Sequence, residues 1–373
     1  MPPTKPDPEA YREALVASRE LVLELREEQA ERIAEALEAF ADGLEQAYEQ
    51  EFSGMRAAGL DNEAALRRSE EIVRSQAEAM LEVLTRSTEQ NRTASFDRVL
   101  QVWGDTAEQI AASNDIDLSE FGGVRSSPVT LMGQYEAVGA AENWRTLLRA
   151  HVENAASEAN RIIRTGMAEG VHATELSRRL RRYAEGSEEL DEFFDDVQTA
   201  TGEVKKIDLR QNIPDDLQGA VQQMRFNADR IAASEIQNAR SEAEIQHFGR
   251  DPMVEAISWR LSPIHEDIDE CDSLARNDFY GMGPGVYPVF RCPPPPHPFD
   301  MCEKITVTRR PQEFGEPKPH PGLQQNPQDV VLPGGELTDA RERRIRQQVG
   351  RALEEGNRMF DEVRDQLGGL IAA

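Results

Sequence analysis

The chain has 373 residues, and its 69 acidic and 42 basic side chains give a formal net charge of −27 at pH 7. This charge opposes strong DNA binding at low salt, because contacts to phosphate need lysine and arginine. Its length predicts two or three domains, and its three cysteines are too few for a disulfide scaffold, so we expect a reducing compartment. No run of ~18 apolar residues is present and the N-terminus has no apolar signal core, so we expect neither a membrane span nor a secretory signal.

The basic residues are strongly biased toward arginine, since only five of the 42 are lysines. Few lysines, many arginines and a large acidic excess are typical of a salt-adapted protein from a GC-rich source, such as a halophilic archaeon or its virus. Carboxylates keep a surface hydrated and self-repelling where salt screens charge strongly. GC-biased codon usage combined with an acidic partner surface is the alternative explanation.

Apolar residues spaced three and four apart predict long amphipathic helices in the first part of the chain. The first helix covers residues 8–52. Asp61 is a suitable N-cap for the second. The apolar run from Phe96 to Trp103 marks a third helix, which Gly104 is expected to end.

The middle of the chain alternates between helical and irregular composition. Residues 114–140 are rich in Gly, Ser, Asn and Pro and predict a loop. Further helices are predicted over 141–168 and 215–248. Between them we expect a short basic helix over 174–182 and a solvated, acid-rich connector over 185–203.

The character of the sequence changes after residue 250. Residues 254–261 and 304–309 are short and β-like, and we expect them to pair antiparallel and close the base of the loop 262–302. This loop is expected to hold little regular structure and has few aliphatic side chains, so packing against the 215–248 helix, a metal cross-link, or both must organise it.

The predicted fold is mainly α: long amphipathic helices with a small, loop-rich α+β module toward the C-terminus. Residues 310–336 are rich in proline and are expected to form a flexible tether before a final amphipathic helix. The expected regions are a helical region over 1–140, the module over 141–309, the linker over 310–336 and the C-terminal helix over 337–373.

The cysteines and two histidines form the strongest chemical pattern. Cys271, Cys292, His297 and Cys302 follow the spacing Cys-x20-Cys-x4-His-x4-Cys, and His265 lies six residues before the first cysteine. Thiolates and imidazoles together complete tetrahedral zinc sites. The spacing lacks the CxxC pairs of a zinc knuckle, so buried structural cysteines and a turn-capping histidine remain the alternative.

The turn before Cys271 is dense in carboxylates. Asp267, Asp269 and Asp272 could bind a hard cation through oxygen. The glycine and the final glutamate that a calcium-binding EF-hand loop needs are missing, so a solvated acidic turn is the preferred interpretation.

Glu235 lies on the apolar face of the predicted 215–248 helix. A carboxylate there needs a partner, for which Arg230 or a group from the Cys/His loop are the candidates. We expect an anchoring role rather than a catalytic one, because no nucleophile or second acid accompanies Glu235. No GxSxG, Walker A, HExxH or GxGxxG motif occurs, so we expect no enzyme and no catalytic residue.

Four stretches, taken in order, resemble the phage Mu F-like minor head proteins, the family of the phage head-morphogenesis domain. This sequence departs from the family pattern at two positions. Ala233 stands where the family has an arginine before its Thr-Glu pair (here Ser234 and Glu235), and Asp300 stands in place of a cysteine. The matching stretches are 162–180, 230–235, 259–288 (with Gly281, Gly283 and Gly285) and 297–307.

The resemblance strengthens the expectation of one structural zinc ion. It favours His265, Cys271, His297 and Cys302 as ligands, with Cys292 or Asp300 as alternates. It implies structural roles for a second set of residues: Glu235, Arg230, Trp259, Asp269 and Asp272.

The resemblance further implies a virion component that acts in head morphogenesis. Its expected partners are the portal protein and the major capsid or scaffold subunits, with no membrane and no strong DNA contact at low salt. The expected location is the host cytoplasm during assembly and then the virion head. The alternatives are a metal-dependent hydrolase or toxin-type enzyme on the Cys/His/Asp loop, and a zinc-stapled binding adaptor.

The charge excess generates a first prediction. The thermal midpoint should rise as KCl approaches molar concentration, because screening relieves repulsion among the carboxylates at a net charge of −27. Thermal melts over a KCl series measure this. A midpoint that does not move between low and high salt would remove the halophile interpretation.

Overall fold

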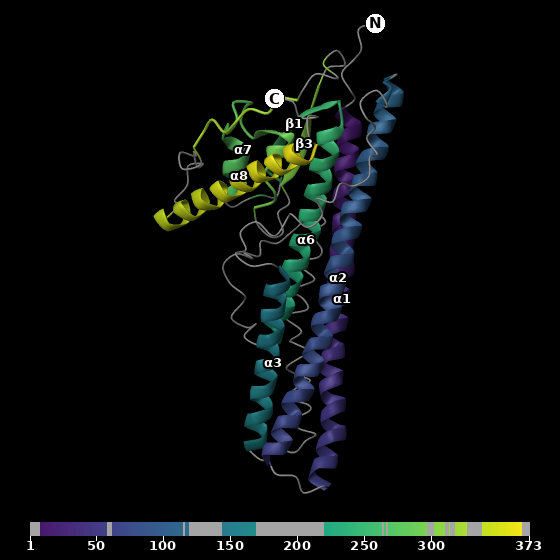
Figure 1. Cartoon of the computed structure of the whole chain (residues 1–373), viewed down its shortest axis with the longest axis vertical. Helices are drawn as coiled ribbons and strands as arrows, with labels where there is room; N and C mark the ends of the chain where they lie inside the picture. Colours follow the sequence, from purple (N-terminus) through teal and green to yellow (C-terminus); the bar gives the residue numbers. More distant parts are fainter. Residues whose placement is uncertain are drawn as a thin grey trace. The chain divides into compact units, whose positions relative to one another are not determined.

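A computed structural model describes nine main stretches of the chain and two isolated residues (Figure 1). The described chain is mainly helical, with one small antiparallel sheet in its C-terminal part, as the sequence predicts. No helix in it has the length and apolar character to cross a bilayer. The described residues are 8–57, 62–114, 116–118, 144–168, 220–262, 265, 268–296, 302–309, 313, 318–326 and 338–367.

Two long helices open the chain, α1 (Pro8–Ala57) and α2 (Asn62–Ser113). The expectation that Gly104 ends a separate third helix was wrong, because α2 continues through it. A glycine inside a helix costs only about 1 kcal/mol, and the buried Phe96, Trp103 and Ala107 on either side offset that cost by packing in the core.

Three further helices follow the predicted pattern closely: α3 (Trp144–Ala168), α6 (Ala220–Arg250) and α8 (Asp339–Leu367). The expected short basic helix over 174–182 and the acid-rich connector over 185–203 lie outside the described residues.

The chain divides into two compact units, each assembled from stretches that are far apart in sequence, so neither coincides with one of the consecutive regions expected above. α1, α2 and α6 each contribute residues to both. The first unit comprises Met1–Leu23, Arg92–Ala141 and Ser234–Ala373, and the second comprises Glu24–Asn91 and Glu142–Ala233.

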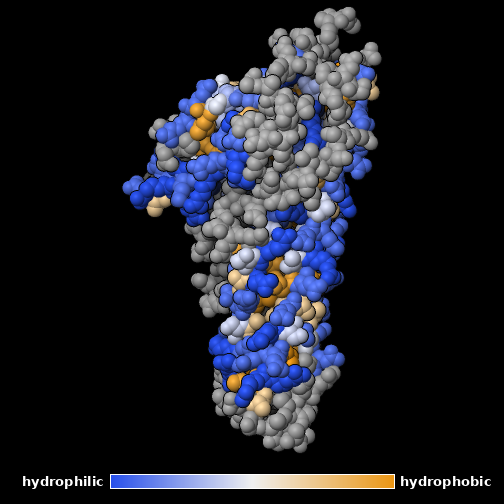
Figure 2. All heavy atoms as spheres, in the orientation of Figure 1, coloured by the Kyte–Doolittle hydropathy of each residue, from blue (hydrophilic) through white to orange (hydrophobic). Residues whose placement is uncertain are grey.

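The second unit has a core of interlocking helix faces. Residues from α1, α2, α3 and α6 contribute to it, among them Phe40, Leu44, Trp144 and Leu148. In the same unit, Gln29 accepts a hydrogen bond from Ser87 Oγ at 2.7 Å. Polar and charged side chains cover much of the face that Figure 2 presents, with apolar side chains showing between them.

The sheet lies in the first unit and has the strand order β2-β1-β3. β1 (Val254–Arg260) is central and almost wholly buried, and β2 (Val286–Pro288) and β3 (Glu303–Thr308) pair with it antiparallel. Ser258 lies opposite Ile305 in the register. The predicted antiparallel pairing of 254–261 with 304–309 is therefore confirmed.

The loop 262–302 contains more regular structure than we expected. It holds the helix α7 (Glu270–Arg276), strand β2 and a 3-10 turn, η2 (Val289–Arg291). Its side chains share one core with α6, including Ala243 and Phe248 of that helix and Leu274 and Tyr287 of the loop. Packing against α6 thus organises the loop, one of the two means that the sequence left open.

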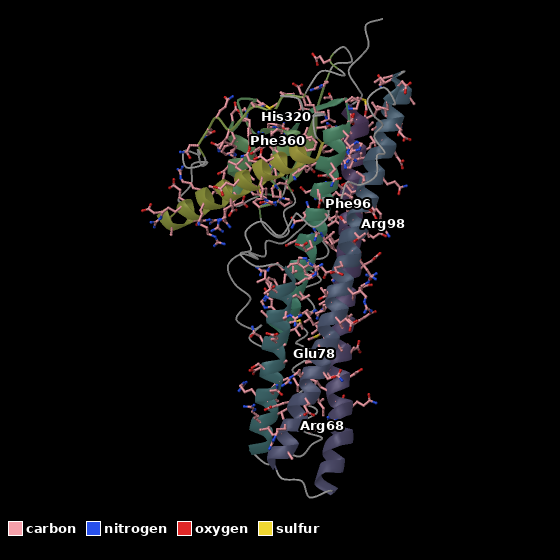
Figure 3. All side chains as sticks on the ribbon, in the orientation of Figure 1. Arg68, Glu78, Phe96, Arg98, His320 and Phe360 are labelled. Atoms are coloured by element: carbon pink, nitrogen blue, oxygen red, sulfur yellow. The ribbon has the colours of Figure 1, made fainter. Side chains whose placement is uncertain are left out.

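Part of the expected Pro-rich tether is packed against this core. Lys318 Nζ donates hydrogen bonds to the backbone carbonyls of Phe248 and of Asp251, the latter at 2.8 Å. The His320 ring lies 5.2 Å from that of Phe360 on α8 (Figure 3) and 6.3 Å from that of Phe290. The expectation of a flexible tether was wrong for 318–326, because Lys318 donates to carbonyls at the end of α6 and the His320 ring packs beside α8.

Candidate functional site

The first turn of α7 is held by its own carboxylates. Asp269 is the N-cap and its side chain accepts a hydrogen bond from the backbone N–H of Cys271 at 2.6 Å. Asp272 completes a capping box, because its Oδ2 accepts from the backbone N–H of Asp269 at 3.1 Å. Short acidic side chains at these two positions satisfy the free N–H groups that begin a helix. The two carboxylates are therefore fixed in place.

His265 meets both carboxylates. Its Nε2 lies 2.9 Å from Asp272 Oδ2 and 3.6 Å from Asp269 Oδ1. Its other nitrogen, Nδ1, lies 4.0 Å from the sulfur of Cys302, the residue before β3. Arg276 contacts the second oxygen of Asp272 at 3.1 Å. The cluster thus joins α7 and the segment before it to the residue that precedes β3.

The electrostatics of the cluster favour a charged ring between charged acids. Burial alone lowers the pKa of His265, but the hydrogen bonds to Asp272 and Cys302 and the charge of Asp269 outweigh it and raise the pKa to about 10. Burial alone raises the pKa of Asp272, but the hydrogen bonds from His265 and from the Asp269 N–H outweigh it and lower the pKa.

The structure brings together only part of the predicted zinc ligand set. His265 and Cys302 are neighbours. Cys271 and Cys292 are fully buried in the apolar core of the first unit. Burial raises the pKa of the Cys292 thiol to about 12, which disfavours the thiolate that a metal needs. His297 and Asp300, the remaining candidates, lie outside the described residues.

Asp269 and Asp272 differ from the expected solvated acidic turn. Their side chains are 3 % and 4 % exposed, so the expectation was wrong for these two carboxylates. Their structural role as caps agrees with the sequence-based assignment. An acid at the N-cap and another three residues later is a capping-box signal, and it could have shown from sequence alone that both side chains point inward.

Glu235 has a partner that the sequence did not suggest. Its carboxylate is buried and lies 3.4 Å from Nη1 of Arg92, on α2. The candidates from the sequence were Arg230 and a group from the Cys/His loop, whereas the arginine of this pair comes from α2. Sequence spacing within one helix could not reveal a partner from another helix.

About two turns further along α6, Glu242 is buried near the same arginine. Gln246 Nε2 donates to one Glu242 oxygen at 3.4 Å. Burial raises the pKa of Glu242 to about 8, although the charge of Arg92 opposes the rise. Glu242 is thus a buried acid that holds its proton at neutral pH.

The rest of α6 is tied to its neighbours by polar contacts. Glu244 accepts from Arg240 Nε at 2.8 Å and from Ser18 Oγ on α1 at 3.2 Å. Ser241 accepts from Lys304 of β3, whose ammonium also lies 5.5 Å from the centre of the Trp259 ring. Trp259, assigned a structural role from sequence, is therefore part of the buried face of β1.

Just after α6, Asp251 is the centre of a second buried group. It accepts hydrogen bonds from Tyr11 Oη at 2.9 Å and from the backbone N–H of Met253 at 2.8 Å. His247 Nε2 lies 3.6 Å from the same carboxylate. The chain turn that leads from α6 into β1 is thereby fixed to the start of α1.

Comparison of the chain with protein-family models, with curated proteins and with solved structures found no match.

Glu242 generates a prediction with a defined sign. Its pKa is about 8 in the folded protein against an ordinary value of 4.5, so between these values the folded state binds a proton that the unfolded chain has released. The contribution of Glu242 to the free energy of unfolding is therefore fully present below about pH 4.5 and is lost as pH rises through 8. Glu242→Gln should match the wild type near pH 5 and exceed its unfolding free energy at pH 9 by on the order of 3 kcal/mol.

Chemical denaturation at pH 5, 7 and 9 measures this difference. Glu20→Gln, an exposed glutamate on α1, is the matched control and should show no pH-dependent gain. A Glu242→Gln curve parallel to the wild type over the whole range would mean that Glu242 is not a buried, protonated acid.

Proposed function

We propose that this chain is a structural protein of viral head assembly, associated with the portal and the procapsid interior. The proposal begins with the ordered resemblance to the phage Mu F-like minor head proteins. The observation that carries it is that the matching stretches 259–288 and 297–307, which are separated along the chain, contribute side chains such as Trp259, Tyr287 and Cys302 to one core of the first unit.

The glycine-rich part of the resemblance has a clear structural reason. Gly281, Gly283 and Gly285 all have positive φ angles, of 71°, 110° and 67°, which favour glycine. The Gly285 carbonyl accepts a hydrogen bond from the Trp259 N–H at 2.7 Å. A Cβ on Gly285 would come within 2.6 Å of the Ala275 carbonyl oxygen. These glycines thus let the loop fold closely onto β1 and α7, as a shared module would require.

Two general properties suit an assembly role. Long helices offer extended faces for packing against other subunits. The net charge of −27 keeps the protein from adhering to packaged DNA at low salt.

A metal-dependent hydrolase is the second candidate function. The observation that favours it is the His265, Asp269 and Asp272 cluster, which could hold a metal ion. The particle experiment below separates the two, because an unrelated hydrolase has no reason to enter capsids.

The test is to co-express the full chain with the portal, scaffold and major capsid proteins of the virus or provirus that encodes it. We expect the chain to co-sediment with procapsids and to resist added protease until the particles are opened. Gly285→Ala should reduce its incorporation severalfold, because the new Cβ meets backbone on two sides. Gly322→Ala, where a Cβ meets nothing within 4 Å, is the matched control and should be incorporated normally.

If particles form and the wild-type chain stays with the soluble proteins at the top of the gradient, the head-assembly proposal fails.

A further inference from the structure

We propose that His265, Asp269 and Asp272 form a binding site for one divalent transition-metal ion of the Zn²⁺ type. The inference does not depend on the head-assembly proposal. It also replaces the thiolate-based ligand set that the sequence favoured with one nitrogen and two oxygen donors.

The spacing of the donor atoms fits one ion. Three residues, His265, Asp269 and Asp272, each offer one ligand atom, and these three atoms lie within 4.8 Å of one another. The nitrogen is 2.9 Å from one oxygen and 3.6 Å from the other. Metal–ligand bonds of ~2.0–2.2 Å place neighbouring donors of a tetrahedral or octahedral ion about 3.0–3.5 Å apart. Small adjustments of three side chains would therefore suffice, and the ion would take the place of the proton that His265 Nε2 shares with Asp272 and release it to solvent.

The donors are held in place before any ion binds. Both carboxylates are buried, and each also accepts a backbone N–H of the α7 cap. Arg276 contacts the oxygen of Asp272 that faces away from His265. Hydrogen bonds of this kind orient the ligands of metal sites.

The imidazole ring is oriented from its other side. His265 Nδ1 lies 4.0 Å from Cys302 Sγ, so Nε2 is the nitrogen presented to the two carboxylates. Metal-binding histidines commonly use their second nitrogen in this way. Cys302 is accordingly a positioning residue in this site and not one of its ligands.

The donor set indicates the class of ion. One imidazole nitrogen disfavours Ca²⁺ and Mg²⁺, which prefer oxygen ligands throughout. Mixed imidazole and carboxylate donors suit Zn²⁺ and neighbouring transition metals. Three protein ligands leave a coordination position for water or for a group from a partner.

The test uses the full-length chain without a histidine tag, stripped with a chelator and held in molar KCl to suppress loose binding to surface carboxylates. Equilibrium dialysis with Zn²⁺ followed by elemental analysis should give one ion per chain. Co²⁺ in its place should give visible d–d bands without the intense near-ultraviolet absorption of a thiolate ligand.

Asp269→Asn is the most informative variant, because asparagine caps a helix as well as aspartate does but is a far weaker metal ligand. We expect it to keep the metal-free melting temperature within a few degrees and to lose at least tenfold in Zn²⁺ affinity. His265→Gln should behave in the same way toward Zn²⁺. Cys271→Ser and the exposed Glu20→Gln are the matched controls and should bind one ion with unchanged affinity.

Two results would overturn the proposal. One is the absence of stoichiometric binding by the wild type, which would leave the three side chains as a salt-bridged cap of α7. The other is binding that survives Asp269→Asn, disappears in Cys271→Ser and carries a thiolate absorption with Co²⁺, which would return the site to the cysteines.

Discussion

The burial of charged side chains on α6 is the constraint on which the first unit depends. Every residue from Ser241 to Phe248 is buried, although this stretch contains two glutamates, a glutamine and a histidine. Buried charges are costly unless other groups pair with them. The partners of α6 come from different parts of the chain: Arg92 of α2 pairs with Glu235, Ser18 of α1 with Glu244 and Lys304 of β3 with Ser241. Each contact specifies how one element meets α6, so together they select one packing.

The candidate metal site is held in position by contacts to the same helix, α6. β1 and β3 are joined in register, β3 is fastened to α6 through Lys304, and α7 shares its core with α6. These contacts bring His265, ahead of α7, to Cys302, ahead of β3. Carboxylates that cap a helix and also face an imidazole serve two purposes. They complete the fold of the loop without a metal, and they present oxygen donors to one when it is available.

Local patterns predicted the elements well, because spacing and β-branched runs determine helix and strand directly. They predicted the pairing of β1 with β3, and they singled out Glu235 as a carboxylate on an apolar face and His265 as a candidate metal ligand. They could not supply partners from distant helices, so Arg92 was missed. They also misjudged Gly104, since packing of Phe96 and Trp103 outweighs a weak helix propensity. Clustering of cysteines suggested thiolate ligands, whereas Cys271 and Cys292 behave as small core residues.

A double-mutant cycle on Arg92 and Glu235 tests the central claim most directly, using the unfolding free energies of Arg92→Met, Glu235→Gln and the double variant. If buried pairing on α6 holds the first unit together, each single change should cost about 3–5 kcal/mol. The double variant should then cost less than the sum of the two by at least about 1 kcal/mol, because the second change no longer strands a buried charge. Two small and additive losses would contradict the account and leave apolar packing alone as the determinant of this fold.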